Sequence, residues 1–321
     1  MERKLILDTD GGVDDAQALL MLIAAGRTPD LITTVFGNVD LTAATRNILS
    51  VLAVAGKPEV PVQMGADRPL AQPAIDATNI HGADGLGGAP RPATIPNPVG
   101  RDGVRVLIAT LQEATEKGEK VDLLMIGPLT NLALAIRQAP QCVEGVGQLT
   151  MMGGTIHGRG NITPAAEFNI FSDPEAAAVV FGADIEIIMV PWETCMTQKI
   201  EGPEVDQFFA ALPDGPYQVF SHALAHHARS VIKGFGGGDH MRFVDPLAAA
   251  VVINRTIVTK SQQACVEVAL SPGVTRAMTV IDPTGRLGTP NVSLVENADL
   301  DRVIALYQAS IAYDTPQTAV P

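Results

Sequence analysis

The chain has 321 residues, of which 46% are hydrophobic and 18% charged, a globular composition that excludes bulk disorder and allows a large buried core. Its formal net charge of −13 disfavours nucleic-acid polymers, which are bound through cationic contacts to phosphate, and favours a neutral or cationic small-molecule substrate. No apolar run is long enough for a membrane helix and no room precedes the first strand for a signal peptide, so we expect a soluble, cytoplasmic protein with no membrane partner.

Strand-like and helix-like segments alternate through the first half of the chain. An apolar run at 4–7 predicts a strand, and the segment 14–25, which ends before Gly26, predicts a helix. The Gly- and Pro-rich segment 66–103 is predicted to be a long loop with a functional role. The same reasoning predicts strands at 31–36, 61–64 and 122–126 and helices at 42–55, 104–117 and 129–138.

In the second half of the chain, strand-like and helix-like segments alternate at first and are followed by a mostly helical region and then a β-rich one. Asp173 and Pro174 predict the capped start of a helix at 173–181. The region 203–254 is expected to be mostly helical, with a break at 234–239. The remaining predicted elements are strands at 148–152 and 186–190, a loop at 153–163, β-rich pieces at 264–270 and 275–281, and a final helix at 300–313.

This order of elements predicts an α/β fold with a doubly wound, mostly parallel sheet flanked by helices, because parallel neighbours need crossover connections. No internal repeat or linker divides the chain, so we expect a single domain at 1–313 and a loose C-terminal tail at 314–321. Cys142, Cys195 and Cys265 are odd in number, widely spaced and in no CxxC pair, so we expect buried free thiols rather than a zinc site or disulfides.

Four aspartates gather where the first predicted strand gives way to the first helix. They are Asp8, Asp10, Asp14 and Asp15, at the carboxyl end of a strand, where open α/β sheets bind ligands. Two carboxylates about 4 Å apart repel by roughly 4 kcal/mol at an effective dielectric near 20, and no Lys or Arg lies nearby in sequence. A divalent cation would offset this repulsion, and all-oxygen ligands suit calcium or magnesium rather than zinc. Helix capping and backbone hydrogen bonding are the alternative, but they account for only one or two of the four.

The segment 8–16, Asp-Thr-Asp-Gly-Gly-Val-Asp-Asp-Ala, resembles the N-terminal signature of the inosine–uridine-preferring nucleoside hydrolases. Further matches follow in the family's order and cover nearly the whole chain, at 37–39, 80–88, 127–132, 152–154, 160–169, 173–177 and 245–248. The resemblance implies the nucleoside hydrolase fold, with its Rossmann-like core. It also implies calcium-dependent hydrolysis of the N-glycosidic bond of a ribonucleoside to ribose and free base.

The same resemblance assigns a calcium site. Its protein ligands would be Asp10, Asp15, Asp245 and the main-chain carbonyl of Ile126, and the ribose 2′- and 3′-hydroxyls and a water would complete the coordination. Asp10 would also be the general base that activates this water for attack on C1′ of an oxocarbenium-like ribosyl group. Asp245 precedes a proline, so a helix cap is the alternative for that residue.

A second implied set of residues would bind the sugar. Holding each ribose hydroxyl favours ring distortion and the developing oxocarbenium ion. For the two asparagines the alternative is a turn residue, and for the methionine it is plain core packing. The set implied by the resemblance is Asp14, Asn38, Met152, Asn161, Glu167 and Asn169.

The chain departs from the family pattern at Val244. Many members carry a histidine there that protonates or positions the leaving base, and valine has no proton to give. By family position, His81 in the Gly-rich loop is the best substitute, and a loop histidine satisfied by backbone is the alternative. One of the histidines in the helical region is a further option for the leaving-group acid, and the sequence does not choose among His222, His226, His227 and His240.

Base preference stays open at this level. Trp192 is expected to be core rather than a stacking platform, whereas Phe235 and Phe243 are candidate base contacts. The resemblance also implies a homodimer or homotetramer, although the sequence reveals no interface.

Two rival functions remain. A magnesium-dependent phosphatase of the haloacid dehalogenase type would use Asp8 as nucleophile and Asp10 as acid/base, but it leaves the pair at 14–15 and the segment 167–169 unexplained. A non-catalytic nucleoside- or ribose-binding member of the same fold is favoured by Val244. Asp10 argues against it, because a pure binder needs no base.

Overall fold

Buried strands in a parallel sheet read as continuous apolar runs, and these runs form most of the strands here. The computed structural model describes residues 3–313, so the predicted tail at 314–321 lies outside the described residues. The strands are β1 (Lys4–Thr9), β2 (Leu31–Thr34), β3 (Val62–Met64), β4 (Val121–Met125), β5 (Val146–Met152), β6 (Ile187–Val190), β7 (Lys199–Glu201), β8 (His240–Arg242), β9 (Val258–Val268), β10 (Thr279–Asp282) and β11 (Val292–Ala298).

Helices fill most of the connections between these strands. The helix at 173–181 begins as predicted, because the Asp173 carboxylate accepts a hydrogen bond from the backbone N–H of Ala176 and Pro174 occupies the first turn. The α-helices are α1 (Val13–Ala24), α2 (Leu41–Val54), α3 (Thr78–His81), α4 (Gly103–Glu116), α5 (Thr130–Gln138), α6 (Phe168–Ser172), α7 (Pro174–Phe181), α8 (Trp192–Thr197), α9 (Gly202–Ala210), α10 (Pro216–Gly234), α11 (Asp245–Ile253) and α12 (Leu300–Ile311). Two 3₁₀ helices are η1 (Pro140–Gly145) and η2 (Arg255–Ile257).

Nine strands form one sheet in the order β10-β9-β11-β6-β5-β4-β1-β2-β3. All neighbours from β11 to β3 are parallel, and β9 is antiparallel to both of its neighbours, which confirms a mostly parallel sheet. The chain runs outward from β1 through β2 and β3 and then returns to β4 on the other side of β1. The strand order therefore reverses between β1 and β4, and a doubly wound sheet binds ligands at the carboxyl ends beside such a switch point.

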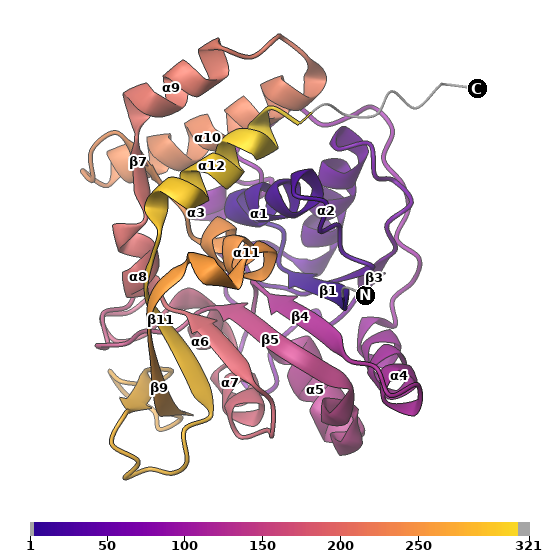
Figure 1. Cartoon of the computed structure of the whole chain (residues 1–321), viewed down its shortest axis with the longest axis vertical. Helices are drawn as coiled ribbons and strands as arrows, with labels where there is room; N and C mark the ends of the chain where they lie inside the picture. The colour runs from indigo at the N-terminus through magenta and orange to yellow at the C-terminus, as the bar shows by residue number, and fades with distance from the viewer. Residues whose placement is uncertain (1–2, 314–321) are drawn as a thin grey trace.

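Helices cover both faces of the sheet (Figure 1). Leu5 and Leu7 of β1 face a layer that contains α1, α2, α10, α11 and α12, whereas Ile6 faces α4, α5 and α7. Both faces are dry, so β1 is buried from its second residue onward. The polar ends of the central strands are consequently where a small molecule can reach this sheet.

Several elements differ from those predicted from sequence, and the short helices α6 and α8 are among those that were not predicted. Strand β11 was not predicted, because its short run at 292–298 includes polar residues and is stabilised by distant partners, β6 and β9. The small antiparallel sheet of β7 and β8 was also missed, and one helical turn, α3, interrupts the predicted 66–103 loop. The three cysteines are buried and free, as expected. Within residues 3–313, no helix is long and apolar enough to cross a membrane.

Candidate active site

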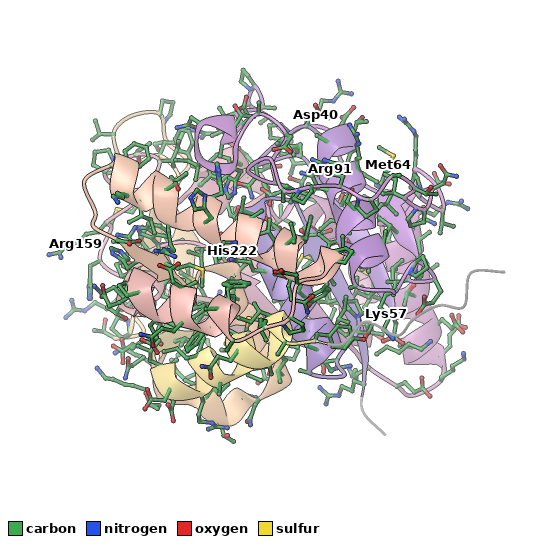
Figure 2. The ribbon with its side chains drawn as sticks, turned by 90° about the horizontal axis from the view of Figure 1, so that it is seen from above. Asp40, Lys57, Met64, Arg91, Arg159 and His222 are labelled. Atoms are coloured by element: carbon green, nitrogen blue, oxygen red, sulfur yellow. The ribbon has the colours of Figure 1, made fainter. Side chains whose placement is uncertain are left out.

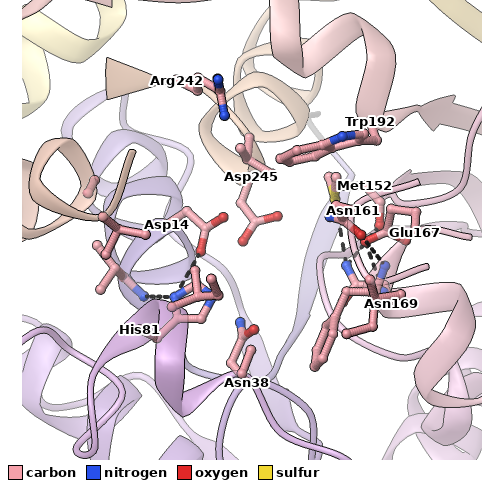
Figure 3. Close-up of a pocket in the computed structure, with 18 of the residues that line it drawn as sticks. Asp14, Asn38, His81, Met152, Asn161, Glu167, Asn169, Trp192, Arg242 and Asp245 are labelled. Atoms are coloured by element: carbon pink, nitrogen blue, oxygen red, sulfur yellow. Dashed lines mark hydrogen bonds and ion pairs between the residues drawn. The ribbon is translucent and has the colours of Figure 1, made fainter. Parts of the chain in front are cut away.

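A cavity of about 680 Å³ opens at the carboxyl ends of the central strands (Figure 3). Segments that follow β1, β2, β4, β5 and β6 reach it, together with α3, α10 and the start of α11. Asp10 and Asp15 are fully buried and do not line it. The other residues predicted for the site all line the cavity: Asp14, Asn38, His81, Ile126, Met152, Asn161, Glu167, Asn169 and Asp245.

The turn between β1 and α1 brings the aspartates together. Gly11 has φ +69°, and a Cβ there would lie 2.7 Å from the backbone of Ala44, so the position requires glycine. The backbone N–H of Gly12 donates to Asp15 Oδ2 at 2.7 Å, and the Thr9 hydroxyl donates to Asp15 Oδ1. The first turn of α1 is thereby folded back over the end of β1.

Asn38 connects two of the carboxylates. Its backbone N–H donates to Asp10 Oδ2 at 2.7 Å, and its side-chain Nδ2 donates to Asp10 Oδ1 at 2.8 Å and to Asp15 Oδ2 at 3.0 Å. Both hydrogens of Nδ2 are therefore used within the protein. Only the Asn38 Oδ1 atom is left to meet a substrate, where it would accept a hydrogen bond from a hydroxyl.

Three carboxylates converge on one point beside the cavity. One oxygen from each of Asp14, Asp15 and Asp245 lies within 4.8 Å of the other two. Asp14 Oδ1 is buried and has no hydrogen-bond partner among the described residues, and no described residue donates to the Asp245 carboxylate. The trio differs from the predicted ligand set because Asp14, expected to bind ribose, stands beside Asp15 and Asp245.

Burial raises the pKa of every carboxyl group in this cluster. The pKa of Asp14 rises to about 6, and that of Asp245 rises well above its ordinary value because of burial and then the charges of Asp14 and Asp15. Burial followed by the charge of Asp15 also raises the pKa of Asp10. Each ionised pair at this spacing repels by about 3 kcal/mol at an effective dielectric near 20. The all-oxygen donors and the unpartnered oxygen atoms fit a hard divalent cation.

The far wall of the cavity is built by the segment 160–169. Asn169 Nδ2 lies 3.3 Å from the carbonyl oxygen of Ile126 and 3.2 Å from that of Met152, so it spans the ends of β4 and β5. Glu167 caps α6, and its carboxylate accepts hydrogen bonds from the N–H groups of Gly154, Asn169 and Ile170. Burial raises the pKa of Glu167 to about 7.

Asn161 is held in the same segment. Its Oδ1 accepts a hydrogen bond from the N–H of Phe168 at 2.8 Å, which closes the loop before α6. Asn161 is thus a turn residue, and it also lines the cavity, so the two interpretations made from sequence are compatible.

His81 stands at the N-terminus of α1. Its Nδ1 accepts the backbone N–H of Val13 at 3.1 Å and lies 3.7 Å from Asp14 Oδ1. Burial lowers the pKa of His81 to about 4, and the nearby charge of Asp15 opposes this shift. A neutral ring that accepts at Nδ1 carries its hydrogen on Nε2. In this state His81 can donate a hydrogen bond to a substrate but has no spare proton to release.

The other histidines separate into two groups. His227 lines the cavity, and its Nε2 hydrogen-bonds to the carbonyl of Ile80 at 2.8 Å, which braces α3 against α10. His222 lies away from the cavity among α9 and α10 (Figure 2), with its ring 4.8 Å from that of Phe209. His226 and His240 do not line the cavity either, so His227 is the only member of this group in a position to meet a substrate.

The expected base contact at Phe243 is wrong, whereas Trp192 packs against the core, as expected, and also lines the cavity. Phe243 is fully buried, with its ring 5.5 Å from that of Tyr307, so it belongs to the core and not to the base pocket. Trp192 is half-buried and lines the cavity, because it begins α8 immediately after β6 and Pro191 instead of lying within the strand. Phe235, at the end of α10, is 73% exposed and lines the cavity, and its contact with a base stays a prediction.

Sequence reasoning missed Arg242. It lies on β8, a strand that was not predicted, and no motif marks it, yet its side chain lines the cavity three residues before Asp245. Only its place in the folded chain identifies it.

Asp8 has a structural role. It is fully buried and accepts hydrogen bonds from the Thr33 hydroxyl and, at 2.7 Å, from Asn131 Nδ2, and burial raises its pKa to about 7. Asp8 Oδ2 is thus engaged between β2 and α5, and neither Asp8 nor Asp10 lines the cavity. Nothing in this arrangement favours the phosphatase alternative.

Comparison of the chain with known proteins identifies the family that its motifs resemble. The profile of the inosine-uridine preferring nucleoside hydrolases matches residues 5–305. The non-specific ribonucleoside hydrolase RihC of Klebsiella pneumoniae subsp. pneumoniae is 36% identical over 94% of this chain and 95% of its own length. An uncharacterized protein of Schizosaccharomyces pombe is 44% identical over 59% of this chain and 60% of its own length. The solved structure of an inosine-guanosine nucleoside hydrolase superposes with a TM-score of 0.87 at 26% identity, covering 98% of this chain and all 100% of that one. The chain therefore belongs to the inosine-uridine preferring nucleoside hydrolase family, as an enzyme that hydrolyses ribonucleosides.

Proposed function

We propose that this enzyme is a calcium-dependent ribonucleoside hydrolase that releases ribose and a free base in the cytoplasm. The observation that carries this proposal is the convergence of the Asp14, Asp15 and Asp245 carboxylates beside a cavity large enough for a nucleoside. The similarity to RihC, a non-specific ribonucleoside hydrolase, supports a neutral nucleoside as the substrate class.

Asp10, Asp15, Asp245 and the carbonyl of Ile126 are the proposed calcium ligands, and the position of Asp14 makes it an additional candidate. A bound calcium ion would supply positive charge that lowers the pKa of water and orients the ribose hydroxyls. Oxygen ligands favour this ion or magnesium over a softer metal, and the family resemblance favours calcium.

The chain's own residues would carry the remaining steps. Asp10 is the proposed general base, taking a proton from the water whose oxygen bonds to C1′ while the C1′–N bond breaks and its electron pair leaves with the base. Asp14, Asn38, Asn161, Glu167 and Asn169 are the proposed ribose partners, a list in which Asn38 offers an acceptor. Met152 would lie beneath the sugar, and His81 would donate its Nε2–H to the substrate.

Release of ribose is the direct test. We expect free ribose from a panel of inosine, adenosine, guanosine, uridine and cytidine, and we expect release to stop when a chelator removes calcium and to return when calcium is restored. The Asp10→Asn variant should lose at least about 100-fold in kcat while staying folded, because a positioned base contributes roughly 100- to 10,000-fold.

The same assay separates the alternative function. Nucleoside binding by calorimetry without ribose release from any member of the panel would favour the non-catalytic binding protein. Activity of Asp10→Asn within tenfold of the parent would remove Asp10 as the base.

A further inference from the structure

Arg242 lines the cavity beyond Asp245, on the side opposite Asn38 (Figure 3). In Figure 3 it stands with Trp192 across the cavity from Asn38 and His81. The antiparallel pairing of β7 and β8 fixes its backbone opposite Lys199, and its side chain enters the cavity wall. The carboxylates mark where ribose binds, so Arg242 stands where the base would lie.

Its guanidinium group has no partner among residues 3–313. No described residue forms a hydrogen bond or an ion pair with it, and its Nε atom is buried without an acceptor. Among the described residues that line the cavity, Arg242 is the one Lys or Arg, and the other charged groups there are carboxylates. Burial lowers the pKa of Arg242. A guanidinium nevertheless keeps its proton in proteins, so the wall carries a partly desolvated positive charge.

The surroundings of Arg242 suit a flat heterocycle. Apolar side chains from α10 and from the start of α11 also line the cavity, as does Trp192; they are Val231, Ile232, Phe235 and Val244. Pockets that bind small molecules combine apolar walls with a few placed polar groups that fix orientation. In this cavity the polar group is the planar Arg242 guanidinium. Its two parallel N–H donors can pair with two neighbouring acceptor atoms of a ligand but not with a donor.

We propose that Arg242 binds O6 and N7 of a 6-oxopurine base and stabilises the negative charge that develops on this base as it leaves. This inference rests on the proposed nucleoside hydrolase function and adds a substrate class to it. It gives the cavity a replacement for the histidine that is absent at Val244, with a group that stabilises charge instead of donating a proton.

The chemistry is balanced without a proton from Arg242. The C1′–N9 bond breaks, its electron pair moves onto the base, and the charge delocalises toward N7 and O6, opposite the guanidinium. The water oxygen bonds to C1′ and gives its proton to Asp10, and the base anion takes a proton from solvent water. Interactions that strengthen as charge develops lower the barrier to the chemical step.

The geometry of the donors gives base discrimination. Inosine and guanosine present two acceptors, O6 and N7, to the fork, as guanine does to arginine in nucleic-acid recognition. Adenosine presents N7 beside an N6 amino donor, which would face another N–H and leave a buried donor unpaired. The structure thus assigns Arg242 as a specificity-determining residue that favours 6-oxopurine ribonucleosides.

The test compares kcat/KM for inosine, adenosine and p-nitrophenyl riboside, whose leaving group is a stable anion and needs no help. Arg242→Met should lower the value for inosine by roughly 10- to 100-fold, the effect of a lost charge-assisted hydrogen bond, and the values for the other two by less than about fivefold. Arg242→Lys keeps the charge and loses the fork, so it should reduce the inosine-to-adenosine ratio and should lower turnover of inosine less than Arg242→Met does. The matched control is Lys199→Met, which removes a cation from the neighbouring strand and should change none of the three values by more than about twofold, as expected for an exposed charge.

Two outcomes for the variants and two for the parent enzyme would overturn the proposal. An inosine-to-adenosine ratio that stays unchanged in both Arg242 variants would remove the specificity role. Equal losses on p-nitrophenyl riboside and inosine would assign Arg242 to the sugar or to the fold, and melting temperatures would show which. A parent enzyme that hydrolyses p-nitrophenyl riboside and adenosine but not inosine contradicts only the role of Arg242. A parent enzyme inactive on all three contradicts the proposed function as well.

Discussion

Asp245 is 2% exposed, accepts no hydrogen bond from the described residues and faces two other carboxylates. Burying an unpaired ionised group is unfavourable, and the folded chain responds by raising the pKa of this carboxyl. Such a residue opposes folding in the metal-free chain. Its presence at the start of α11 fits the proposed metal site better than a contribution to stability.

We expect Asp245→Asn to stabilise the metal-free protein and to weaken calcium binding. Relief of like-charge repulsion should raise the melting temperature in chelator by roughly 2–5 °C, the change produced by about 1–2 kcal/mol in a chain of this size. The calcium dissociation constant measured by titration calorimetry should rise at least about tenfold, as expected when a charged ligand is lost. Asp184→Asn, at an exposed position, is the matched control. An unchanged dissociation constant for Asp245→Asn would remove this residue from the ligand set.

The His81 ring contacts both the start of α1 and the cavity, so its two possible roles must be separated by comparing substrates. If its Nε2–H assists the departing base, His81→Ala should lower kcat/KM for natural nucleosides by about tenfold or more and leave p-nitrophenyl riboside within a few-fold, because the loss is that of one hydrogen bond to a developing charge. Unlike the Arg242 variants, His81→Ala should leave the ratio of kcat/KM for inosine to that for adenosine unchanged. Equal losses on the natural and synthetic substrates would instead assign His81 to holding the N-terminus of α1.

Among single residues, sequence reasoning placed those that belong to motifs. The predicted residues from Asp14 to Asp245 all line or adjoin one cavity. Most of them follow or end a strand whose carboxyl end could be inferred, whereas His81 and Asp245 were identified from their motifs alone. Arg242, Trp192 and Phe243 were missed or misplaced. Their orientation depends on β8 and on the first turn of α8, which are set by tertiary pairing rather than by local pattern.

The loop that follows β5 is an element whose shape depends on one carboxylate. Glu193, in α8, accepts hydrogen bonds from the backbone N–H groups of Ile156 at 2.8 Å and His157 at 2.9 Å. The loop is fixed again where the N–H of Trp192 donates to the Gly154 carbonyl at 2.9 Å. These contacts hold the segment that carries Asn161 into the cavity.

Replacing Glu193 with Gln should therefore loosen this loop. The amide group cannot accept at both ends, so one backbone N–H loses its partner, and we expect a loss of about 1–2 kcal/mol in stability. KM for nucleosides should rise several-fold, with a smaller change in kcat, because Asn161 would be less well positioned. Hydrogen exchange of residues 155–163 should become faster, whereas Glu204→Gln on the exposed side of α9 should leave it unchanged. Unaltered exchange in Glu193→Gln would show that the loop is held by other contacts.

At the level of elements, the sequence was most informative where local pattern and burial agree. Helix α7 begins at its predicted cap, and the central parallel strands lie at or near the predicted runs. Strand β11 escaped prediction because it joins the sheet between β6 and β9, which lie far away in sequence. A strand that is stabilised mainly by distant partners leaves a weak local signal.

Across the whole molecule, the mostly parallel sheet followed from the alternation of elements, and its reversal between β1 and β4 places the ligand site. The expected homodimer or homotetramer stays a prediction, because interface residues carry no pattern that a single sequence reveals. The cavity itself is a property of the complete fold, since its walls come from segments between residues 13 and 245.

Removal of the metal should therefore destabilise the entire chain and not one segment. A ligand that binds only the folded state at 1,000 times its dissociation constant contributes about 4 kcal/mol, so we expect a chelator to lower the melting temperature by roughly 5–10 °C. Differential scanning calorimetry with and without added calcium would measure this shift, and added magnesium is the comparison that identifies the ion. A melting temperature that stays the same when calcium or magnesium is added would contradict a metal site in this cluster.

The distance along the chain between Asp15 and Asp245 also determines how long the ribosome takes to complete the carboxylate trio. At roughly 5–20 residues per second, the ribosome needs about ten to fifty seconds to add the last member of the carboxylate trio after the first. During that interval the nascent chain exposes part of an acidic cluster that has neither its third carboxylate nor the α10 wall. On the proposed function, a chain that ends before Asp245 lacks one carboxylate of the metal site, so we expect such a prematurely terminated product not to cleave nucleosides.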